Sequence, residues 1–134
     1  MKIENEFIPY TEALKLKELG FNEKCIGIYY NNGKKFLISE TLMTNSELDS
    51  YNSPDSEMST PLYQQAFRWF REKHEIEATT ACFYSERLGV SYKEREYHCH
   101  IIRDGVTSKG PKYKTYEEAE LSCLKKLIEI VKEK

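Results

Sequence analysis

Residues Thr60–Lys73, T-P-L-Y-Q-Q-A-F-R-W-F-R-E-K, decide the fold that the sequence predicts. Thr60 favours the N-cap of a helix, and Pro61 favours its first position. Apolar residues then recur at the spacing of one helical face, at Tyr63, Ala66, Phe67 and Phe70. The only tryptophan, Trp69, lies on an adjoining stripe. Because this apolar arc is wide, we predict a central helix covered on more than one side, with Trp69 at least half buried.

The composition favours one domain without a basic or membrane-spanning character. The 134 residues include 40% hydrophobic side chains, enough for one core, and 20 Lys and Arg against 22 Asp and Glu. This balance gives no charge argument for nucleic-acid binding. No segment approaches the roughly 20 apolar residues of a transmembrane helix, and the amino terminus lacks the apolar part of a signal peptide. We therefore expect a cytoplasmic protein.

Two elements are predicted before the central helix. A helix over residues 9–19 should end at Gly20, because glycine favours the left-handed conformation that stops a helix. A hairpin over residues 25–38 should turn at Asn32-Gly33, since both central residues of a type I′ turn need positive φ. Residues 39–59 are rich in Ser, Thr and acids and contain no Lys or Arg, so they predict a mobile acidic loop. This loop is either a contact segment or a tolerated insertion.

A second ribbon and a last helix are predicted after the central helix. The ribbon consists of strands over residues 76–84 and 94–102. Thr115 and Glu118 form a capping-box pattern at the start of the helix that follows. The order α-β-β-α-β-β-α predicts a single α+β domain over residues 1–134, with two antiparallel ribbons packed with three helices.

The four cysteines are widely spaced within apolar strand or helix patterns. Thiols in such positions are usually small buried hydrophobes, and the chain has no secretion signal. We therefore predict reduced core cysteines at Cys25, Cys82, Cys99 and Cys123.

His98 and His100 suggest the sharpest chemical hypothesis, a metal-dependent enzyme. Two histidines at i and i+2 share one face of a strand, and their spacing can bring two imidazoles to one metal ion. Glu96 lies on the same face as a possible third ligand. The alternative is a solvated strand face. Because the chain has no nucleophile elbow, phosphate loop or paired-acid motif, we expect no enzyme activity and no cofactor.

A basic segment before the last helix suggests nucleic-acid binding as an alternative function. Its candidate contacts are Lys109, Lys112, Lys114 and, for base stacking, Tyr113. The segment K-G-P-K-Y-K resembles the basic turn of double-stranded-RNA-binding domains. That family has lysines in the first helical turns, whereas this chain has Glu117, Glu118 and Glu120. These like charges would repel a phosphate backbone.

Three strings resemble a family of short proteins encoded by bacteriophages and integrated elements. They are I-P-Y-T-E-A-L-K-L-K-E-L-G-F (8–21), P-L-Y-Q-Q-A-F-R-W-F-R-E-K (61–73) and Y-K-T-Y-E-E-A-E-L-S-C-L-K-K-L-I-E (113–129). The family has no established activity, so the resemblance implies no catalytic residue. It implies a phage or prophage accessory protein in the bacterial host cytoplasm.

The leading functional hypothesis is a non-enzymatic protein that binds a host or phage protein, with interference in host defence as one possible use. Its expected contact surface is the aromatic face of the first hairpin together with the adjacent acids, namely Tyr29, Tyr30, Phe36, Glu47, Asp49 and Asp55. The alternative is that these aromatic residues only cover a helix. Leu121 and Ile130 lie off the apolar stripe of the last helix, which suggests a homodimer.

Overall fold

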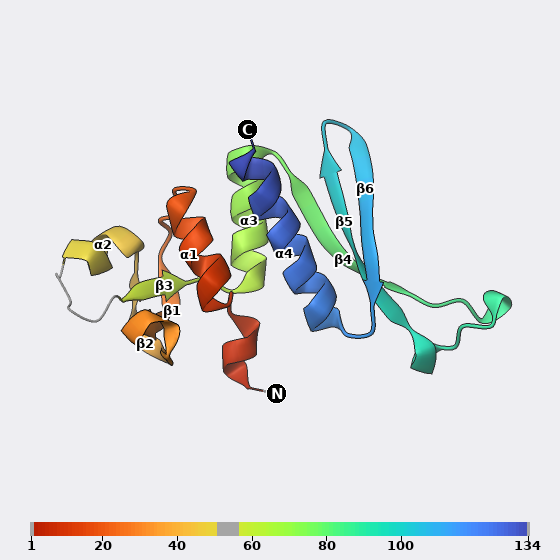
Figure 1. Cartoon of the computed structure of the whole chain (residues 1–134), viewed down its shortest axis with the longest axis horizontal. Coiled ribbons are helices and arrows are strands. Elements are labelled where there is room, and N and C mark those ends of the chain that lie inside the picture. Colours follow the sequence, from red (N-terminus) through yellow and green to blue (C-terminus); the bar gives the residue numbers. More distant parts are fainter. Residues whose placement is uncertain (1, 51–56, 134) are drawn as a thin grey trace. The chain divides into compact units, whose positions relative to one another are not determined.

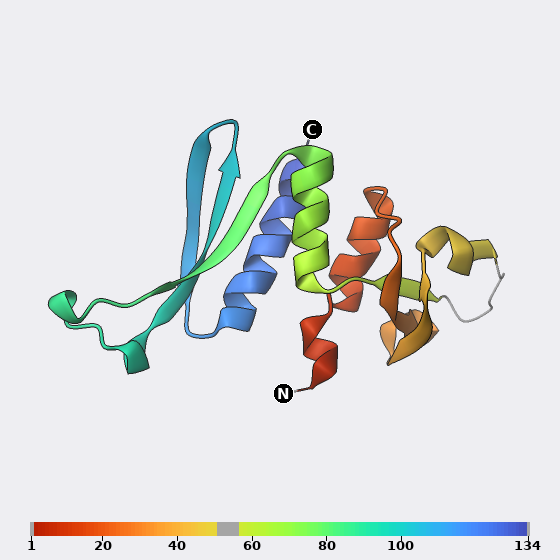
Figure 2. The same ribbon diagram turned by 180° about the vertical axis from the view of Figure 1, so that it is seen from behind.

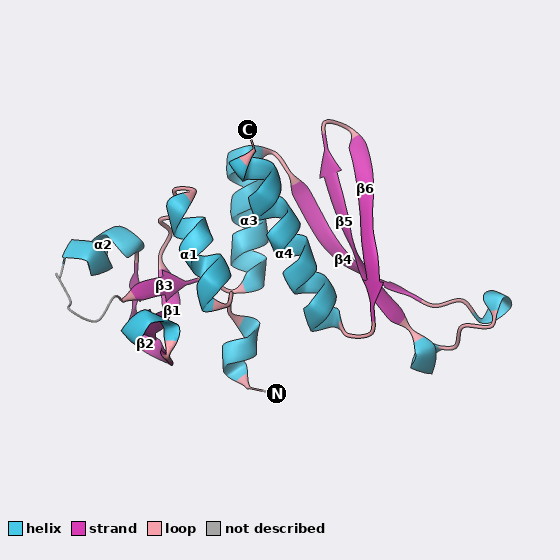
Figure 3. Ribbon diagram, viewed as in Figure 1, coloured by secondary structure: helices cyan, strands magenta, loops and turns pink. Residues whose placement is uncertain are grey.

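The computed structural model describes residues 2–50 and 57–133, and the chain divides into two compact units, Met1–Ala66 and Phe67–Lys134. Each unit contains helices and a three-stranded antiparallel sheet (Figure 3), which confirms the α+β class. The boundary falls within the predicted central helix. The single domain over residues 1–134 stays a prediction.

The first unit contains one sheet with strand order β2-β1-β3. Its elements, shown from red to yellow-green in Figure 1, are a 3-10 turn (Ile3–Glu6), α1 (Tyr10–Glu18), β1 (Cys25–Tyr30), β2 (Lys35–Met43), α2 (Asn45–Ser50) and β3 (Met58–Thr60).

The end of α1 confirms the predicted glycine stop. Gly20 has a φ of 99°. The Gly20 N–H donates to the Lys17 carbonyl (3.0 Å), and the Phe21 N–H donates to the Leu16 carbonyl (2.9 Å), as in a Schellman motif. Phe21 and Leu16 are both buried, so this ending also anchors α1 in the core.

The first hairpin has the predicted register. Tyr29 pairs with Phe36, and the positive φ predicted for Asn32 and Gly33 is found at 57° and 89°. Asn31 also has a positive φ of 49°, so the turn is longer than the expected two-residue turn. A side chain at Gly33 would collide with the Tyr10 ring, which explains the need for glycine at this position.

The prediction of an acidic loop over residues 39–59 is wrong for most of its described part. β2 continues to Met43, α2 follows, and β3 pairs with β1. The Asn45 side chain connects two of these pieces, because its Oδ1 accepts the Ser59 N–H at 3.0 Å. Residues 51–56, including Asp55, lie outside the described residues.

The central helix α3 (Tyr63–His74) begins later than predicted. Thr60 belongs to β3, and its hydroxyl donates to the Ile8 carbonyl at 2.6 Å. Leu62 directly precedes the helix, so Thr60 does not occupy the predicted N-cap position. The Ala66 N–H donates to the Leu62 carbonyl, so the helical hydrogen bonds start there. The predicted burial of Trp69 is confirmed, since its exposed fraction is 6%.

The second unit begins within α3 and contains a sheet with strand order β4-β5-β6. Its further elements are β4 (Glu77–Phe83), β5 (Glu96–Arg103), β6 (Val106–Tyr113) and α4 (Tyr116–Lys132). Helix α4 lies along this sheet, and the connection between β4 and β5 extends away from it (Figures 1 and 2). The two strands of the predicted second ribbon are confirmed.

Strand β6 is the main element that the sequence analysis does not predict; it contains most of the basic segment before the last helix. Asp104 and Gly105 have positive φ values of 53° and 76° and form a two-residue turn. Arg103 pairs with Val106 across this turn, and the chain continues as a third strand. Asp-Gly is a strong hairpin signal, and it would have indicated this strand.

Helix α4 starts as predicted. The Glu118 N–H donates to Thr115 Oγ1 (3.2 Å), and the Thr115 hydroxyl donates to Glu118 Oε1 (2.8 Å). Its buried side includes the predicted stripe residues Ala119, Cys123, Leu124, Leu127 and Ile128. No helix within the described ranges is long and apolar enough to cross a membrane.

Candidate functional site

The aromatic surface predicted on the first hairpin is largely interior. Tyr29 is 4% exposed, its hydroxyl donates to the Ile8 carbonyl (3.2 Å), and its ring contacts those of Tyr10 and Phe36. Burial raises the pKa of Tyr29 to about 12. The placement of Tyr29 on a contact surface is therefore wrong. Tyr30 and Phe36 are half-buried, and a role for them in partner binding stays a prediction.

The described acids of the same predicted surface are exposed but take part in local structure. Asp49 forms an ion pair with Lys17 at 2.8 Å. The Glu47 N–H and carboxylate both bond the Thr44 hydroxyl, each at 3.1 Å, at the start of α2. These acids therefore help to hold α2, and binding of a partner by them stays a prediction.

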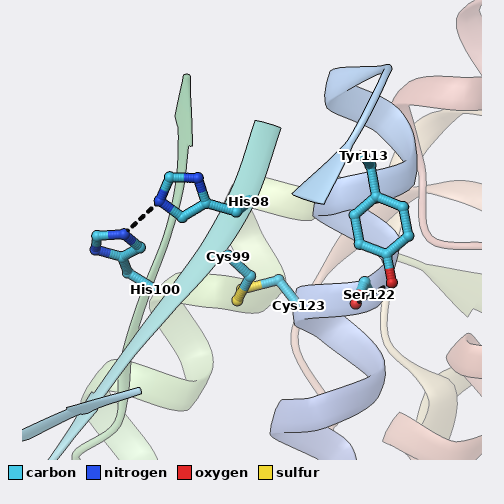
Figure 4. Close-up of a disulfide and its surroundings, with 6 residues drawn as sticks. All are labelled: His98, Cys99, His100, Tyr113, Ser122 and Cys123. Atoms are coloured by element: carbon cyan, nitrogen blue, oxygen red, sulfur yellow. Dashed lines mark hydrogen bonds between the residues drawn. A yellow bond between two sulfur atoms is a disulfide. The ribbon is translucent and has the colours of Figure 1, made fainter. Parts of the chain in front are cut away.

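The open face of the second sheet, the face opposite α4, brings two predicted residues into contact. Figure 4 shows His98 and His100 on one side of β5 and the Cys99–Cys123 disulfide on the other. The two Nε2 atoms are 2.6 Å apart, so one imidazole donates to the other. His98 is only 6% exposed, which corrects its expected place on a solvated face.

This geometry does not support the predicted metal site. Two imidazole ligands of one tetrahedral zinc ion lie about 3.3 Å apart, given Zn–N bonds of about 2.0–2.1 Å. The His98 and His100 Nε2 atoms are closer than that and bond each other. Within residues 2–50 and 57–133, no group of three or more His, Cys, Asp or Glu side chains could hold a metal ion. Glu96 is therefore not brought into a ligand set with the two histidines.

A β-bulge in β6 places two lysines beside the histidine pair. Lys112 pairs with His98 and Lys109 with His100, and the register shifts between these pairs. Lysines three residues apart would face opposite sides of a regular strand, and the bulge brings both to the open face. A Cβ added to Gly110 would lie 3.5 Å from the Cys99 Cβ, so this extra residue borders the opposite face.

The charges on this face act on His98. Burial, then His100, Lys109 and Lys112, lower the pKa of His98 below its usual value. Its Nδ1 atom is buried and has no hydrogen-bond partner among the described residues. The Lys112 Nζ lies 4.2 Å from the centre of the Phe83 ring. The face therefore combines positive charge with an unsatisfied polar atom.

The other two residues predicted for nucleic-acid binding lie apart from this face. The half-buried Tyr113 donates its hydroxyl to Ser122 of α4 at 3.1 Å, so its ring is not free to stack on a base. Lys114 is exposed and follows the end of β6. Of the predicted set, the structure brings together only Lys109 and Lys112.

The prediction of four reduced core cysteines is wrong for three of them. Cys99 and Cys123 form a disulfide with a Cα–Cα distance of 5.3 Å, and Cys82 is exposed. Cys99 faces α4, where Cys123 lies on the buried stripe, so tertiary packing brings the two together. Cys25 is buried as predicted, and burial raises the pKa of its thiol to about 12.

The connection between β4 and β5, residues 84–95, carries a surface that the sequence interpretation missed. Tyr84, Leu88 and Tyr92 are exposed by 48%, 74% and 55%. The rings of Tyr84 and Tyr92 meet edge to face at 5.3 Å, and the Arg95 guanidinium lies 4.1 Å from the Tyr92 ring centre. We call these four side chains the β4–β5 loop cluster. Large apolar residues in a polar connection were the signal that could have indicated it.

Leu121 and Ile130, the predicted dimer residues, are half-buried and line two grooves beside α4. The groove at Leu121 has a volume of about 430 Å³ and also contains Tyr113 and Lys125. The groove at Ile130 has a volume of about 420 Å³ and reaches the turn between β5 and β6. A homodimer through these residues stays a prediction.

Comparison with known proteins finds no matching family model, no matching curated protein and no matching solved structure.

Proposed function

We propose that the protein acts by binding another protein through the β4–β5 loop cluster. The main support is that Tyr84, Leu88 and Tyr92 are exposed together on one connection of the second unit. Tyrosine and arginine are enriched among the residues that dominate the energy of protein interfaces. A partner that covered these side chains would remove apolar surface from water.

The contacts among Tyr84, Tyr92 and Arg95 support binding with a small loss of conformational entropy for these three side chains. Tyr92 contacts Tyr84 on one side and Arg95 on the other. Arg95 is held further by its Nε, which donates to the Tyr97 hydroxyl at 2.7 Å. Side chains that are already ordered lose less conformational entropy when a partner binds, so more of the contact energy remains as affinity. The expected partner surface has an apolar pocket for Leu88 and an acidic group for Arg95.

The state of the candidate reactive groups favours binding over catalysis. Cys99 is paired with Cys123, and His98 bonds His100. The Cys25 thiol is buried with a pKa of about 12, so it is protonated and unreactive at neutral pH. These side chains therefore have structural partners or the wrong protonation state for a nucleophile.

The biological setting that we propose is a phage or prophage accessory protein in the cytoplasm of a bacterial host. This setting is based on the resemblance of residues 8–21, 61–73 and 113–129 to short phage-encoded proteins. The partner would then be a host or phage protein, and occupying a component of host defence is one use of such binding.

Quantitative capture from host lysate tests the proposal. Tagged parent protein is compared with Leu88→Ser and Tyr92→Ala, and Leu42→Ser serves as the control because Leu42 is 52% exposed on β2 of the first unit. We expect a specific partner to be lost with the first two variants and kept with the control, while circular dichroism shows all of them folded. Equal recovery with all variants, or no specific partner at all, would contradict the proposal.

Nucleic-acid binding is the second candidate function, favoured by the β6 bulge that places Lys109 and Lys112 on one face. Fluorescence anisotropy with labelled single- and double-stranded oligonucleotides at low salt tests it. We expect binding that weakens with added salt and with Lys109→Gln, because phosphate contacts release counterions. Anisotropy that stays flat for every oligonucleotide removes this candidate.

A further inference from the structure

We propose that His98, His100, Lys109 and Lys112 on the open face of the second sheet form a binding site for a phosphate group. The site deepens the nucleic-acid candidate but does not require it, because a free phosphate offers the same oxyanion. The four side chains come from neighbouring positions of β5 and β6, as the paired register shows. Together they provide hydrogen-bond donors and positive charge, which are the groups that an oxyanion requires.

The neighbouring strand places only small side chains beside the histidines. On β4, Ala81 pairs with His98 and Thr79 pairs with His100, and both are small residues. Lys109 and Lys112 are exposed, so their long side chains can move without any change in the strands. Movement of the two lysines would therefore uncover the buried His98 imidazole for an oxyanion.

The unsatisfied Nδ1 atom of His98 is a second, independent feature of this site. His98 is 6% exposed, and its buried Nδ1 has no hydrogen-bond partner among the described residues. If His100 Nε2 donates to His98 Nε2, the neutral His98 carries its proton on Nδ1. A buried N–H without an acceptor is costly, and a phosphate oxygen would satisfy it.

Protonation of the histidine pair should strengthen its binding of a phosphate group. A pair with one added proton carries N–H groups on both Nδ1 atoms while the two Nε2 atoms still share one proton. A second added proton would set two N–H groups against each other across 2.6 Å, so only one proton can be added while this bond is kept. The singly charged pair is therefore the form that suits an anion best.

The charged groups around the histidine pair predict how anion binding changes with pH. Lys109 and Lys112 face it from β6, Glu96 shares its face on β5, and the paired β4 positions carry no charge. Burial and the nearby positive groups lower the pKa of His98. A bound dianion would oppose those charges and raise the pKa again, so binding should tighten as pH falls.

Nuclear magnetic resonance of the histidine side chains in the full chain tests the site. Sulfate is the first probe, because its charge does not change between about pH 5 and pH 8, where histidine titrates. Inorganic phosphate and a short oligonucleotide are the second and third, with chloride added to match ionic strength. His74, in contact with Trp69 and Phe70, is the internal reference.

We expect sulfate and phosphate to shift the His98 and His100 signals saturably, to leave His74 unchanged and to raise the pKa of His98. Lys112→Gln and Lys109→Gln should each weaken binding by about threefold or more, whereas Lys132→Gln, at the exposed end of α4, should not. Binding of the free anions without the oligonucleotide would support the site and remove the nucleic-acid function. Shifts of His98 no larger than those of His74, or equal effects of all three lysine variants, would overturn the proposal.

Discussion

Each unit contains a three-stranded sheet, but different side chains cover the faces of the two sheets. In the first unit, aromatic side chains fill the space around the sheet, with the Phe36 ring centre 5.1 Å from Phe7 and 5.4 Å from Tyr29. In the second unit, a disulfide joins the central strand to α4 on one face, while polar side chains occupy the other. The charge differs too: residues 1–66 contain 10 acids and 6 Lys and Arg, whereas residues 67–134 contain 12 and 14.

This difference indicates where binding is to be expected. In the first unit, Phe7 packs so closely on the sheet that a Cβ on Gly27 would lie 2.6 Å from its ring. The second sheet keeps a positive open face, and its β4–β5 loop exposes Tyr84, Leu88 and Tyr92. Aromatic residues of the first unit therefore pack in its core, whereas some aromatic residues of the second unit are exposed to solvent.

The largest expected effect comes from the core of the second unit. Phe70 is 0% exposed, and Phe70→Ala should lower the free energy of unfolding by about 3–5 kcal/mol. Phe67→Ala, at 6% exposure, should cost a similar amount. Urea denaturation measures both changes, and Leu42→Ala is the exposed control, expected within about 0.5 kcal/mol. An unchanged midpoint for Phe70→Ala would contradict its place in the core.

The disulfide should make the next largest contribution to the free energy of unfolding, and only in the second unit. Cys99 and Cys123 are 24 residues apart, and closing such a loop stabilises by about 3.5 kcal/mol in the chain-entropy account. Counting thiols by alkylation checks the pairing first. Without reductant, the native protein should react at Cys82 alone, and the denatured protein at Cys82 and Cys25.

Four reactive thiols in the denatured, unreduced protein would contradict this pairing. Such bonds are uncommon in the reducing cytoplasm, so the same count in protein isolated directly from cells also tests the expected location. Double replacement of Cys99 and Cys123 by alanine then measures the contribution to unfolding. The matched control is Cys82→Ala, which removes an exposed thiol from the same unit.

Local signals explain which parts of the fold could be predicted. The stop at Gly20, the register of Tyr29 with Phe36 and the cap at Thr115 depend on residues close in sequence, and all three are confirmed. β3 and the Cys99–Cys123 pair depend on partners far along the chain, and spacing alone does not specify them. The sequence pattern places His98 and His100 on one strand face, but their proximity to Lys109 and Lys112 depends on the bulge, which spacing along the chain does not predict.

A matched pair of glycine substitutions tests whether the two sheets differ in how closely they are packed. Gly27→Ala would place its Cβ 2.6 Å from the Phe7 ring and 2.9 Å from the Thr60 carbonyl oxygen, so we expect a loss of about 1–3 kcal/mol. Gly110→Ala finds its nearest atom at 3.5 Å and should change stability much less. Thermal unfolding measures both. Equal losses would mean that the two sheets are equally crowded at these positions.

A change in pH should have a smaller effect on the free energy of unfolding. The folded-state pKa of His98 lies below the unfolded value, so its stabilising contribution is present above about pH 6.5 and is lost as pH falls through the folded pKa. Urea midpoints measured from pH 7.5 down to about pH 5 should decline, and His98→Gln should flatten part of that slope. Lys132→Gln is the control. A slope that is the same in His98→Gln as in the parent would remove His98 as its source.

The claim that the second unit carries the binding surface is tested most directly by site-specific photo-crosslinking in cells that produce the protein. A photoreactive residue is placed at position 92 in the β4–β5 loop, or at position 42 on β2 of the first unit, where the native side chains are 55% and 52% exposed. We predict a discrete crosslinked protein from position 92 and none from position 42. A crosslink from position 42 alone, or the same products from both positions, would contradict the account.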